Sequence, residues 1–269
     1  MRFVQVVFLT QTELELMVGF RGPDFYDDDE AFAAYMASRE RPDNPNDTLE
    51  RPILLEMVGN LRDRRILDLG CGAANFGQYA LAQGCRVYLG VEASHNMVAA
   101  ARENLAGTSG EIVSAEMESW TYPTATFDLA VSSLALHYVA DLDAVFAGIY
   151  RALVDQGLFV LSVEHPIITS CARGWKQIRR QDWGVDNYFV LGPRETEWLG
   201  GRVIREHRTI EGYVGAMQAA GFVLDGLRES RPRRELFVDE AEYERRRRIP
   251  LFLFLAGHKP TSGATGRKS

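Results

Sequence analysis

The sequence predicts an α/β protein with a doubly wound, mostly parallel β-sheet. Short apolar runs that resemble strands alternate with helical segments, and this alternation is typical of a parallel sheet covered on both faces. The first strand, in "RILDLGCG", ends on Asp68 and enters a turn with two glycines, as in many nucleotide-binding α/β proteins. The 269 residues are 46% hydrophobic, which is enough for one well-buried core.

The elements of this core follow in a regular order. The expected strands are residues 65–69, 85–92, 111–116, 127–136 and 157–165. The expected helices between them are residues 75–83, 94–106 and 141–153. Ser94 offers a capping hydroxyl to the second of these helices. After an interruption, a helix near 210–220 and strands at 222–228 and 250–257 complete the sheet.

Both ends of the chain lie outside this alternation. Residues 1–60 are expected to form an N-terminal extension and a helical cap, with an acidic stretch rich in proline and asparagine at 24–47. "MRFVQVVFLT" at residues 1–10 is far shorter than the roughly 20 apolar residues of a membrane span, so we expect a short strand or frayed extension. Residues 259–269 are expected to be a disordered tail.

The alternation breaks at residues 166–209, between a cofactor-binding core expected at 61–165 and the rest of the core at 210–258. This insertion holds Trp175, Trp183 and Trp198, three of the four tryptophans. Open α/β sheets bind ligands at the carboxyl edge, and loops of this length are often lids or binding elements. The insertion is therefore either an aromatic lid over the substrate or a small β-rich patch that covers the core.

Charge and cysteine content narrow the function classes. The net charge of −7 provides no overall attraction to nucleic acid or to a membrane surface. The three cysteines show no CxxC spacing, and an odd number without an export signal indicates reduced thiols in a cytoplasm. We expect a cytoplasmic protein with a small-molecule substrate and without a metal site, and the sequence leaves its oligomeric state open.

The glycine turn distinguishes between nucleotides. A dinucleotide site needs GxGxxG, so that the helix packs closely and the backbone approaches a diphosphate. Gly70 and Gly72 match the first two glycines, but Asn75 occupies the third position. Asp68, two residues before the turn, would repel a phosphate and suits a cationic ligand. S-Adenosylmethionine has this character, since it carries a sulfonium and an α-amino group and no phosphate.

"DLGCGAA" at 68–74 resembles the first motif of the class I S-adenosylmethionine-dependent methyltransferases. The departure is Ala74, where the family most often has glycine; alanine is tolerated there if φ is negative and costly if φ is positive. Three further motifs follow in order: "LGVEAS" (89–94), "AEMESWTYPTATFD" (115–128) and "SSLALHYVADL" (132–142). The resemblance implies a Rossmann-like, doubly wound sheet of seven strands, a helical N-terminal cap and an insertion after the fifth strand.

The resemblance also assigns roles in cofactor binding. Glu92 would accept hydrogen bonds from the ribose hydroxyls, Glu116 from the adenine amino group, and the Met117 N–H would reach a ring nitrogen. The full set implied is Asp68, Gly70, Gly72, Glu92, Ala93, Glu116, Met117 and Ser133. The family's N-terminal helices close over the cofactor, so Tyr26, Tyr35 or Arg39 would contact it. The alternatives are capping roles for Asp68 and Glu92 and a solvated carboxylate for Glu116.

Methyl transfer to an oxygen can use a proton acceptor, and histidine suits that role because its pKa lies near neutrality. The candidates are His165 after the fifth strand, His137 after the fourth, and His207 near the end of the insertion. For His165 the alternative is a structural hydrogen bond that anchors the insertion, and for His137 it is packing. Adjacent strand residues point to opposite faces, so Glu164 is not expected to orient His165.

The resemblance extends beyond the core. "SVEHP" (162–166), "DWGVDNYF" (182–189) and "RRRRIPLFL" (245–253) are similar to an actinobacterial-type branch of these methyltransferases, with largely unassigned acceptors. The substrate-facing residues expected in the insertion are Asp182, Trp183, Asp186 and Tyr188. Arginines concentrate at 231–234 and 245–248, where interleaved acids favour a solvated, paired surface; the alternative is a docking site for an anionic acceptor or carrier.

The sequence therefore predicts an S-adenosylmethionine-dependent methyltransferase that methylates oxygen or nitrogen of a small molecule, with secondary metabolism as one setting. Three alternatives stay open. The first is a nucleotide-binding oxidoreductase of the NAD(P) type, and the second is a protein with the methyltransferase fold that binds without turnover. The third is use of the cofactor for something besides methyl donation.

Overall fold

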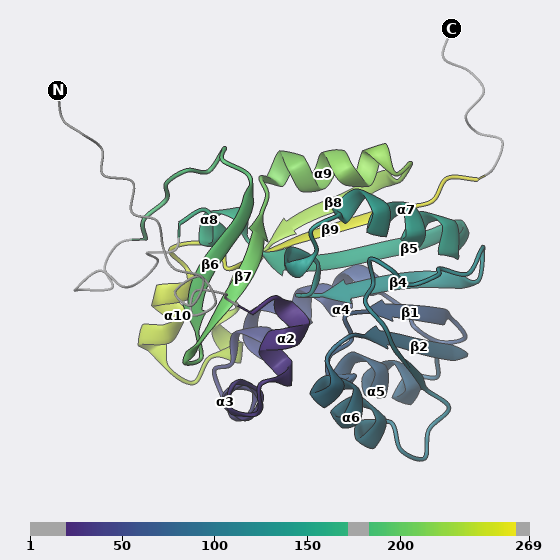
Figure 1. The fold of residues 1–269 in the computed structure, drawn as a ribbon, viewed down its shortest axis with the longest axis horizontal. Coiled ribbons are helices and arrows are strands. Elements are labelled where there is room, and N and C mark those ends of the chain that lie inside the picture. The colour runs from purple at the N-terminus through teal and green to yellow at the C-terminus, as the bar shows by residue number, and fades with distance from the viewer. Residues whose placement is uncertain (1–19, 172–182, 262–269) are drawn as a thin grey trace, which may run out of the picture.

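A computed structural model describes residues 20–171 and 183–261 of the chain. The segment "MRFVQVVFLT", Trp175, Asp182 and residues 262–269 lie outside the described residues. The described residues form a seven-stranded sheet with helices on both faces and a two-stranded sheet at one end (Figure 1). The predicted α/β class is confirmed.

The strand order of the large sheet is β3-β2-β1-β4-β5-β9-β8. The strands are β1 (Arg65–Leu69), β2 (Val87–Glu92), β3 (Glu111–Ser114), β4 (Phe127–Ser133), β5 (Leu153–Glu164), β8 (Val223–Glu229) and β9 (Phe252–His258). Neighbours from β3 to β5 are parallel, whereas β9 pairs antiparallel with both β5 and β8. The order reverses between β1 and β4, and such a switch point opens a crevice at the carboxyl ends of the strands.

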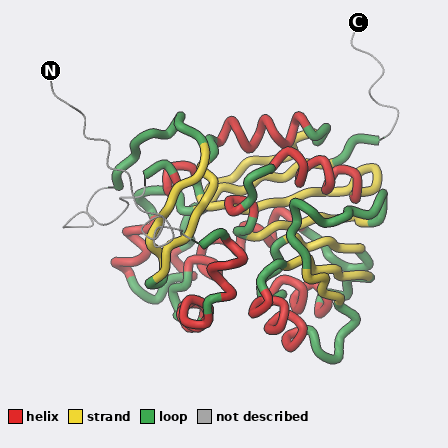
Figure 2. Tube along the Cα trace, viewed as in Figure 1, coloured by secondary structure: helices red, strands yellow, loops and turns green. Residues whose placement is uncertain are grey.

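Helices cover the two faces unequally (Figure 2). The helices on one face are α4 (Arg51–Val58), α5 (Asn75–Ala82) and α6 (His95–Asn104), and those on the other are α7 (Leu142–Ala152) and α9 (Ile210–Ala219). Consecutive strand residues point to opposite faces, so Ile66 packs in the cluster with α4 and α5 and Leu67 in the cluster with α7 and α9. The two hydrophobic cores lie on either side of one sheet.

Local signals account for most boundaries, with one exception. The Ser94 hydroxyl accepts the Met97 N–H at 3.2 Å and caps α6 as expected. By contrast, β5 begins at Leu153, four residues before the expected start, and follows α7 without a loop. Gln156 has a φ of 62°, and the pairing of β5 with β4 shifts register in this part of the strand. This irregularity breaks the two-residue alternation, so the sequence pattern does not show the early start.

A separate layer covers the carboxyl edge of the sheet, at the left of Figure 1. It consists of α2 (Gly22–Asp27), α3 (Asp29–Arg39), the π-helical turn η1 (Asn46–Glu50), α8 (Pro166–Thr169), the hairpin β6 (Gly192–Trp198) and β7 (Gly201–His207), and α10 (Glu240–Arg246). The ring of Phe25 in α2 stacks on Trp198 at 5.2 Å between centroids, and Phe20 bridges to Val203. The N-terminal cap and the insertion therefore pack as one unit.

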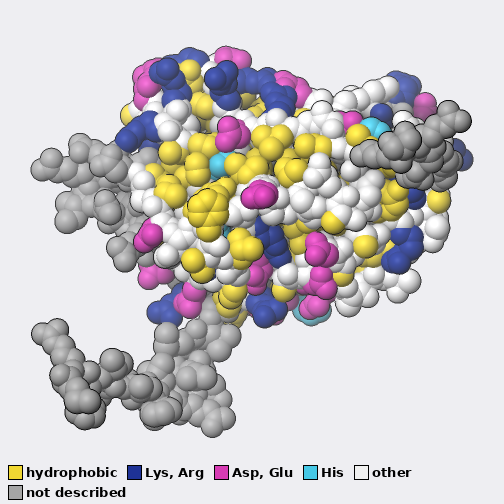
Figure 3. Space-filling model, turned by 90° about the horizontal axis from the view of Figure 1, so that it is seen from above, with side chains coloured by type: hydrophobic (Ala, Val, Ile, Leu, Met, Phe, Trp, Pro, Cys, Tyr) yellow, Lys and Arg dark blue, Asp and Glu magenta, His cyan; other side chains and the backbone are white. Residues whose placement is uncertain are grey.

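No helix in residues 20–171 or 183–261 is both long and apolar enough to cross a membrane. Figure 3 looks onto the face that carries α9, where hydrophobic side chains occupy much of the middle. In the insertion, Val185, Phe189, Val190 and Leu191 are exposed, and Phe189 is 84% exposed. These side chains do not contribute to the buried core.

Candidate functional site

A cavity of about 720 Å³ lies between the carboxyl ends of the parallel strands and the covering layer. This volume falls within the range of about 300–1,000 Å³ found for small-molecule sites. On the sheet side, its wall comes from the segments that follow β1, β2, β3 and β4. On the other side, its wall comes from α3, the hairpin turn and α10.

The turn after β1 brings backbone to the cavity wall. Gly70 has a φ of 67°, and a Cβ there would lie 2.3 Å from the Cβ of Ala135. Gly72 has a φ of 54°. Ala74 is fully buried at a φ of 57°, the conformation in which alanine is costly. The turn therefore depends on three positive φ angles, two at glycines and one at Ala74, which strains it.

Glu92 ties the end of β2 to this turn. One carboxylate oxygen accepts the Gly72 N–H at 2.9 Å, and the other accepts the N–H groups of Ala93 and Ser94, also at 2.9 Å. Burial raises the pKa of Glu92, and the three backbone hydrogen bonds oppose that shift. A carboxylate has about four acceptor positions, so one remains for a ligand. Glu92 and Ala93 both line the cavity.

Asp68 lies beneath the turn and is not part of the cavity wall. Its Oδ2 accepts the hydroxyl of Tyr88 at 2.7 Å, and its Oδ1 is buried without a partner among the described residues. Burial raises the pKa of Asp68 to about 7, and the charges of Glu92 and Glu50 add to the shift. Asp68 therefore influences the site through its charge and its contact with Tyr88, and it does not touch the cavity directly.

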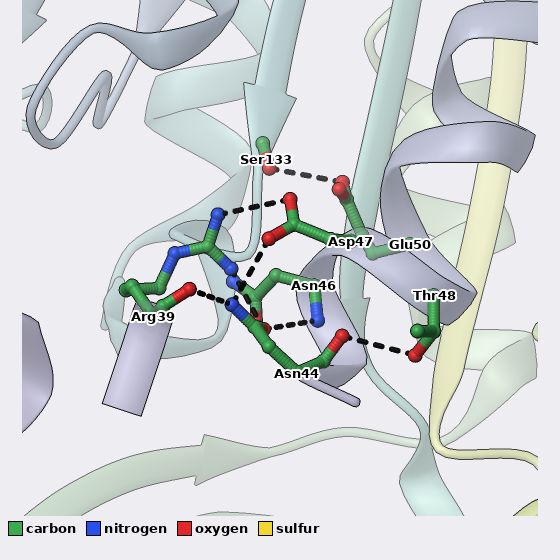
Figure 4. Close-up of polar contacts among 7 residues, drawn as sticks. All are labelled: Arg39, Asn44, Asn46, Asp47, Thr48, Glu50 and Ser133. Atoms are coloured by element: carbon green, nitrogen blue, oxygen red, sulfur yellow. Dashed lines mark hydrogen bonds and ion pairs between the residues drawn. The ribbon is translucent and has the colours of Figure 1, made fainter. Parts of the chain in front are cut away.

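Glu116, Met117 and Ser133 also line the cavity. The Ser133 hydroxyl donates to Glu50 at 2.9 Å (Figure 4). Ser162 donates to the same oxygen at 2.6 Å. Glu50 is buried, and burial raises its pKa. It lies in the π-helical turn, a feature often found at functional sites. Nothing in the sequence pattern around Glu50 indicated this contact.

Arg39 lines the cavity from the end of α3, and a hydrogen-bond network with Asn44 and Asp47 holds its side chain (Figure 4). Its guanidinium donates to Asn44 at 2.9 Å and to Asp47 at 3.3 Å. The Asn44 amide donates back to the Arg39 carbonyl at 2.8 Å and to Asp47 at 3.1 Å. Because Asn44 is buried, this hydrogen-bond network fixes the loop between α3 and η1.

Aromatic side chains and one buried arginine form the next part of the wall. The aromatic residues are Tyr26, Tyr35, Tyr138 and Trp198, whose rings meet mostly edge to face at 5.1–6.4 Å. Arg205 lies over Trp198 at 5.2 Å and pairs with Glu164 at 2.9 Å. Burial raises the pKa of Tyr35 to about 12 and that of Tyr26 well above its ordinary value. These hydroxyls therefore stay protonated and can donate.

His165 and His207 do not line the cavity. His165 Nδ1 accepts the Ile167 N–H at 3.2 Å and caps α8, while Nε2 lies 3.0 Å from Glu229. His207 lies between Thr169 at 2.7 Å and the Tyr188 carbonyl at 2.9 Å. Both rings are fully buried with both nitrogens engaged, which fits anchors of the insertion and does not fit a proton acceptor.

His137 does line the cavity, but its proton position is unsuited to a base. Its Nδ1 accepts the Glu164 N–H at 3.3 Å, so the neutral ring carries its proton on Nε2. Burial lowers the pKa of His137 well below its ordinary value, with Arg205 and Arg208 as further causes. The ring is therefore neutral and offers a donor at its other nitrogen. As expected, Glu164 does not orient His165; it pairs with Arg205.

The expected substrate residues of the insertion lie away from the cavity. Trp183 donates to the Ile167 carbonyl at 3.0 Å, the Tyr188 hydroxyl accepts the Ile210 N–H at 3.3 Å, and Asp186 is exposed. None of these three lines the cavity, and Asp182 lies outside the described residues. Trp198 and Arg205 of the hairpin face it instead. The pair Gly200-Gly201 between two strand-like runs is the sequence signal that could have indicated the hairpin.

Comparison with known proteins identifies the family. A model described as a methyltransferase domain matches residues 67–161. The crystal structure of an S-adenosylmethionine-dependent methyltransferase from Mesorhizobium loti is 34% identical, with a TM-score of 0.73, and the match covers 82% of this chain and 100% of that chain. The chain belongs to the S-adenosylmethionine-dependent methyltransferases. This family membership removes the oxidoreductase alternative, while the actinobacterial-type branch stays a prediction.

Two named relatives match this methyltransferase over a shorter span. A trans-aconitate 2-methyltransferase from Acidovorax sp. is 36% identical over 114 residues, which is 42% of each chain. A malonyl-[acyl-carrier protein] O-methyltransferase from Geobacter sulfurreducens is 32% identical over 137 residues, 49% of this chain and 48% of the relative. The chain thus spans less than half the length of these relatives.

The site fits S-adenosylmethionine, the cofactor of this family. Three buried acids, Asp68, Glu92 and Glu50, lie at or beneath the cavity wall, and one of them keeps an oxygen without a described partner. Such a site suits a sulfonium and an ammonium group and would repel a diphosphate. The glycines of the turn leave no side chain between the backbone and the cavity.

Proposed function

We propose that this methyltransferase methylates a carboxylate oxygen of a small acidic molecule. The observation that carries the proposal is that a single cavity joins the glycine turn and Glu92 to Trp198 and Arg205. One end has the acids and open backbone that suit the cofactor, and the other has aromatic walls and a buried cation. A methyl donor and an acidic acceptor would meet within the same enclosure.

The cofactor end would be held by the residues at the strand ends. Gly70 and Gly72 would present backbone to the methionine part, Glu92 would accept from the ribose, and Glu116 and Met117 would frame the adenine. Ala93 and Ser133 would complete the wall. When bound, the cofactor supplies an electrophilic methyl carbon next to a positively charged sulfur.

Arg39 would bind the α-carboxylate of the cofactor. The acids at the strand ends suit the cationic groups of that molecule, but its carboxylate needs a cation. Arg39 lines the cavity, and its guanidinium is oriented by Asn44 and Asp47 (Figure 4). Its charge also acts on Glu50, the acid hydrogen-bonded to Ser133. The hydrogen-bond network of Arg39, Asn44 and Asp47 would thus hold a cation beside the methionine part of the cofactor.

The other end offers donors that match an acceptor-only group. The Tyr26 and Tyr138 hydroxyls lie 3.4 Å apart, and burial keeps both protonated by raising their pKa. Arg205 is buried and has a planar guanidinium, which pairs with Glu164 and also donates to the Thr196 hydroxyl. A carboxylate has lone pairs for such donors and has no proton that would lack a partner.

A carboxylate acceptor also removes the need for a base. In the displacement, the oxygen–carbon bond forms as the carbon–sulfur bond breaks, and a carboxylate oxygen releases no proton. His165 and His207 lie off the cavity, and His137 presents a donor nitrogen. Catalysis would then depend on alignment and on exclusion of water. The names of the two relatives, trans-aconitate and malonyl methyltransferases, support an acceptor of this kind.

The test is transfer of an isotopic label. The protein is incubated with cofactor labelled on its methyl group and with panels of small carboxylic acids and amines of similar shape, and products are identified by mass spectrometry. We expect labelled methyl esters, which mild alkali hydrolyses to labelled methanol. Label found in amines would refute the carboxylate acceptor, and cofactor binding without any transfer would favour the binding-protein alternative.

A further inference from the structure

Three arginines from two distant segments line the same cavity. Arg41 follows α3, and Arg245 and Arg246 lie in the last turn of α10. All three line the cavity. Asp43, two residues after Arg41, accepts the Val238 N–H at 3.1 Å, which brings the segment after α3 against the segment that leads into α10. The charge of Arg41 accordingly lowers the pKa of Arg246, as do burial and the charge of Arg245, while Glu242 opposes the shift.

The acids beside these arginines are already engaged. Glu242 is shared, because Arg245 and Arg246 both contact the same carboxylate oxygen, the latter at 2.7 Å. Asp43 accepts the Val238 N–H at 3.1 Å, and Asp239 accepts the Ala241 N–H at 2.8 Å and caps α10. In the part of the chain that the structure describes, no hydrogen bond or ion pair involves the Arg41 guanidinium. Arg41 therefore keeps its donors for a ligand, beside Arg245 and Arg246, which both contact Glu242.

Other members of the basic segments behave differently. Arg228 and Arg233 pair with Glu56, and Arg234 pairs with Glu240, all at the surface. Arg247 adjoins Arg246, yet its side chain is 55% exposed and pairs with Glu244. These arginines form the solvated, paired surface that the sequence favoured. Arg245 and Arg246 depart from it because the last turn of α10 directs them to the cavity.

We propose that Arg41, Arg245 and Arg246 form an anion subsite, and that the acceptor carries a carboxylate or phosphate there, separate from the atom that is methylated. The inference rests on the proposed function, since the subsite shares one cavity with Trp198 and Arg205. Guanidinium groups bind both anions through paired N–H donors. The acceptor would be a molecule with two acidic ends whose body lies along the aromatic wall.

Isothermal titration calorimetry on the full chain saturated with S-adenosylhomocysteine tests this inference. The probes are phenyl phosphate, benzoate and the neutral benzyl alcohol, which share one ring. Charge-assisted hydrogen bonds are about twice as strong as neutral ones, so we expect the wild type to bind at least one anion about tenfold more tightly than the alcohol. The better of the two anions distinguishes a phosphate from a carboxylate.

Variants show which arginines cause the preference for anionic probes over benzyl alcohol. Arg41→Gln and the double variant Arg245→Gln/Arg246→Gln should each reduce it about tenfold, whereas Arg247→Gln, the exposed neighbour, should leave it unchanged. Affinity for S-adenosylhomocysteine should stay constant in all of them. If the double variant does not fold, Arg41→Gln alone decides, because that side chain makes no hydrogen bond or ion pair among the described residues.

Two results would overturn the inference: no preference for anions in the wild type, or a preference that persists in both Arg41→Gln and the double variant. A preference that persists in both variants would leave the proposed function standing, since the carboxylate could then bind at Arg205. Without any preference in the wild type, the transfer of labelled methyl to carboxylic acids would decide the proposed function separately. A wild type that binds neither S-adenosylhomocysteine nor S-adenosylmethionine would instead refute the proposed function, and the subsite with it.

Discussion

Replacing Asp68 by asparagine should change how the free energy of unfolding depends on pH. Asp68 is 1% exposed, its Oδ1 has no described partner, and burial raises its pKa to about 7 from an ordinary 3.8. Between these two values the folded state keeps a proton that the unfolded state has lost. Stability from this group is therefore greatest at low pH and falls as the pH rises toward 7.

The size of the change in unfolding free energy follows from the pH range over which only the folded state keeps the proton of Asp68. About two pH units separate pH 5 from the pKa of Asp68, and each is worth about 1.4 kcal/mol. The asparagine in Asp68→Asn cannot ionise, although its amide would bury donors without partners, at a cost of about 1–3 kcal/mol at every pH. The stability of Asp68→Asn relative to the wild type should therefore improve by about 3 kcal/mol between pH 5 and pH 8.

Urea unfolding of both proteins at several pH values measures this difference, and the subtraction removes all other titrating groups. Asp128→Asn is the matched control, because Arg65 holds the pKa of Asp128 below its ordinary range. Asp128 is therefore ionised in both the folded and the unfolded state from pH 5 to pH 8, and the stability of Asp128→Asn relative to the wild type should not change over that range. A relative stability of Asp68→Asn that stays constant from pH 5 to pH 8 would refute the assignment of a buried, unpartnered carboxylate.

Three more predictions concern the site and its supports. Glu92→Gln should weaken S-adenosylmethionine binding about 10- to 100-fold in calorimetry, because hydrogen bonds to a charged group are strong. Glu111→Gln, at an exposed position, should leave the affinity unchanged, and equal affinities of Glu92→Gln and the wild type would remove Glu92 from the site. His165→Gln should keep its turnover but lower the unfolding midpoint by about 2–4 °C through loss of the α8 cap, and a collapse of kcat in a folded variant would restore His165 as a base. Ala74→Gly should relieve about 1–2 kcal/mol of left-handed backbone strain and lose about 0.8 kcal/mol from burial of the methyl group. The midpoint of thermal unfolding should therefore rise by about 2 °C, and a fall would show that the turn is unstrained.

Much of the fold could be predicted because its signals are local. The strand at Arg65–Leu69 and the cap at Ser94 each depend on a few neighbouring residues, and alternation along the chain is enough to give a parallel sheet. The early start of β5 was missed because an irregularity at Gln156 breaks the pattern. The location of Asp68 beneath the turn was missed because its partner, Tyr88, belongs to the next strand.

The roles of the histidines depended on contacts that no local pattern contains. His165 meets Glu229, which lies 64 residues further along the chain, and His207 meets Thr169, 38 residues before it. The sequence placed both at the correct edge of the sheet, but it could not show that their nitrogens were engaged. The Gly200-Gly201 pair could have indicated the hairpin, but not that Trp198 and Arg205 face the cavity.

By itself, the sequence determined the α/β sheet, the family and the cofactor, because strand ends, turn glycines and the acids beside them are contiguous in the chain. The tertiary structure decided the other half of the cavity. Its wall is assembled from the cap, the hairpin and α10, segments that are far apart in the sequence and meet only in the folded chain, through aromatic packing of Phe25 on Trp198 and the hydrogen bond of Asp43 to Val238. Which arginines face the cavity and which face solvent is a consequence of that packing.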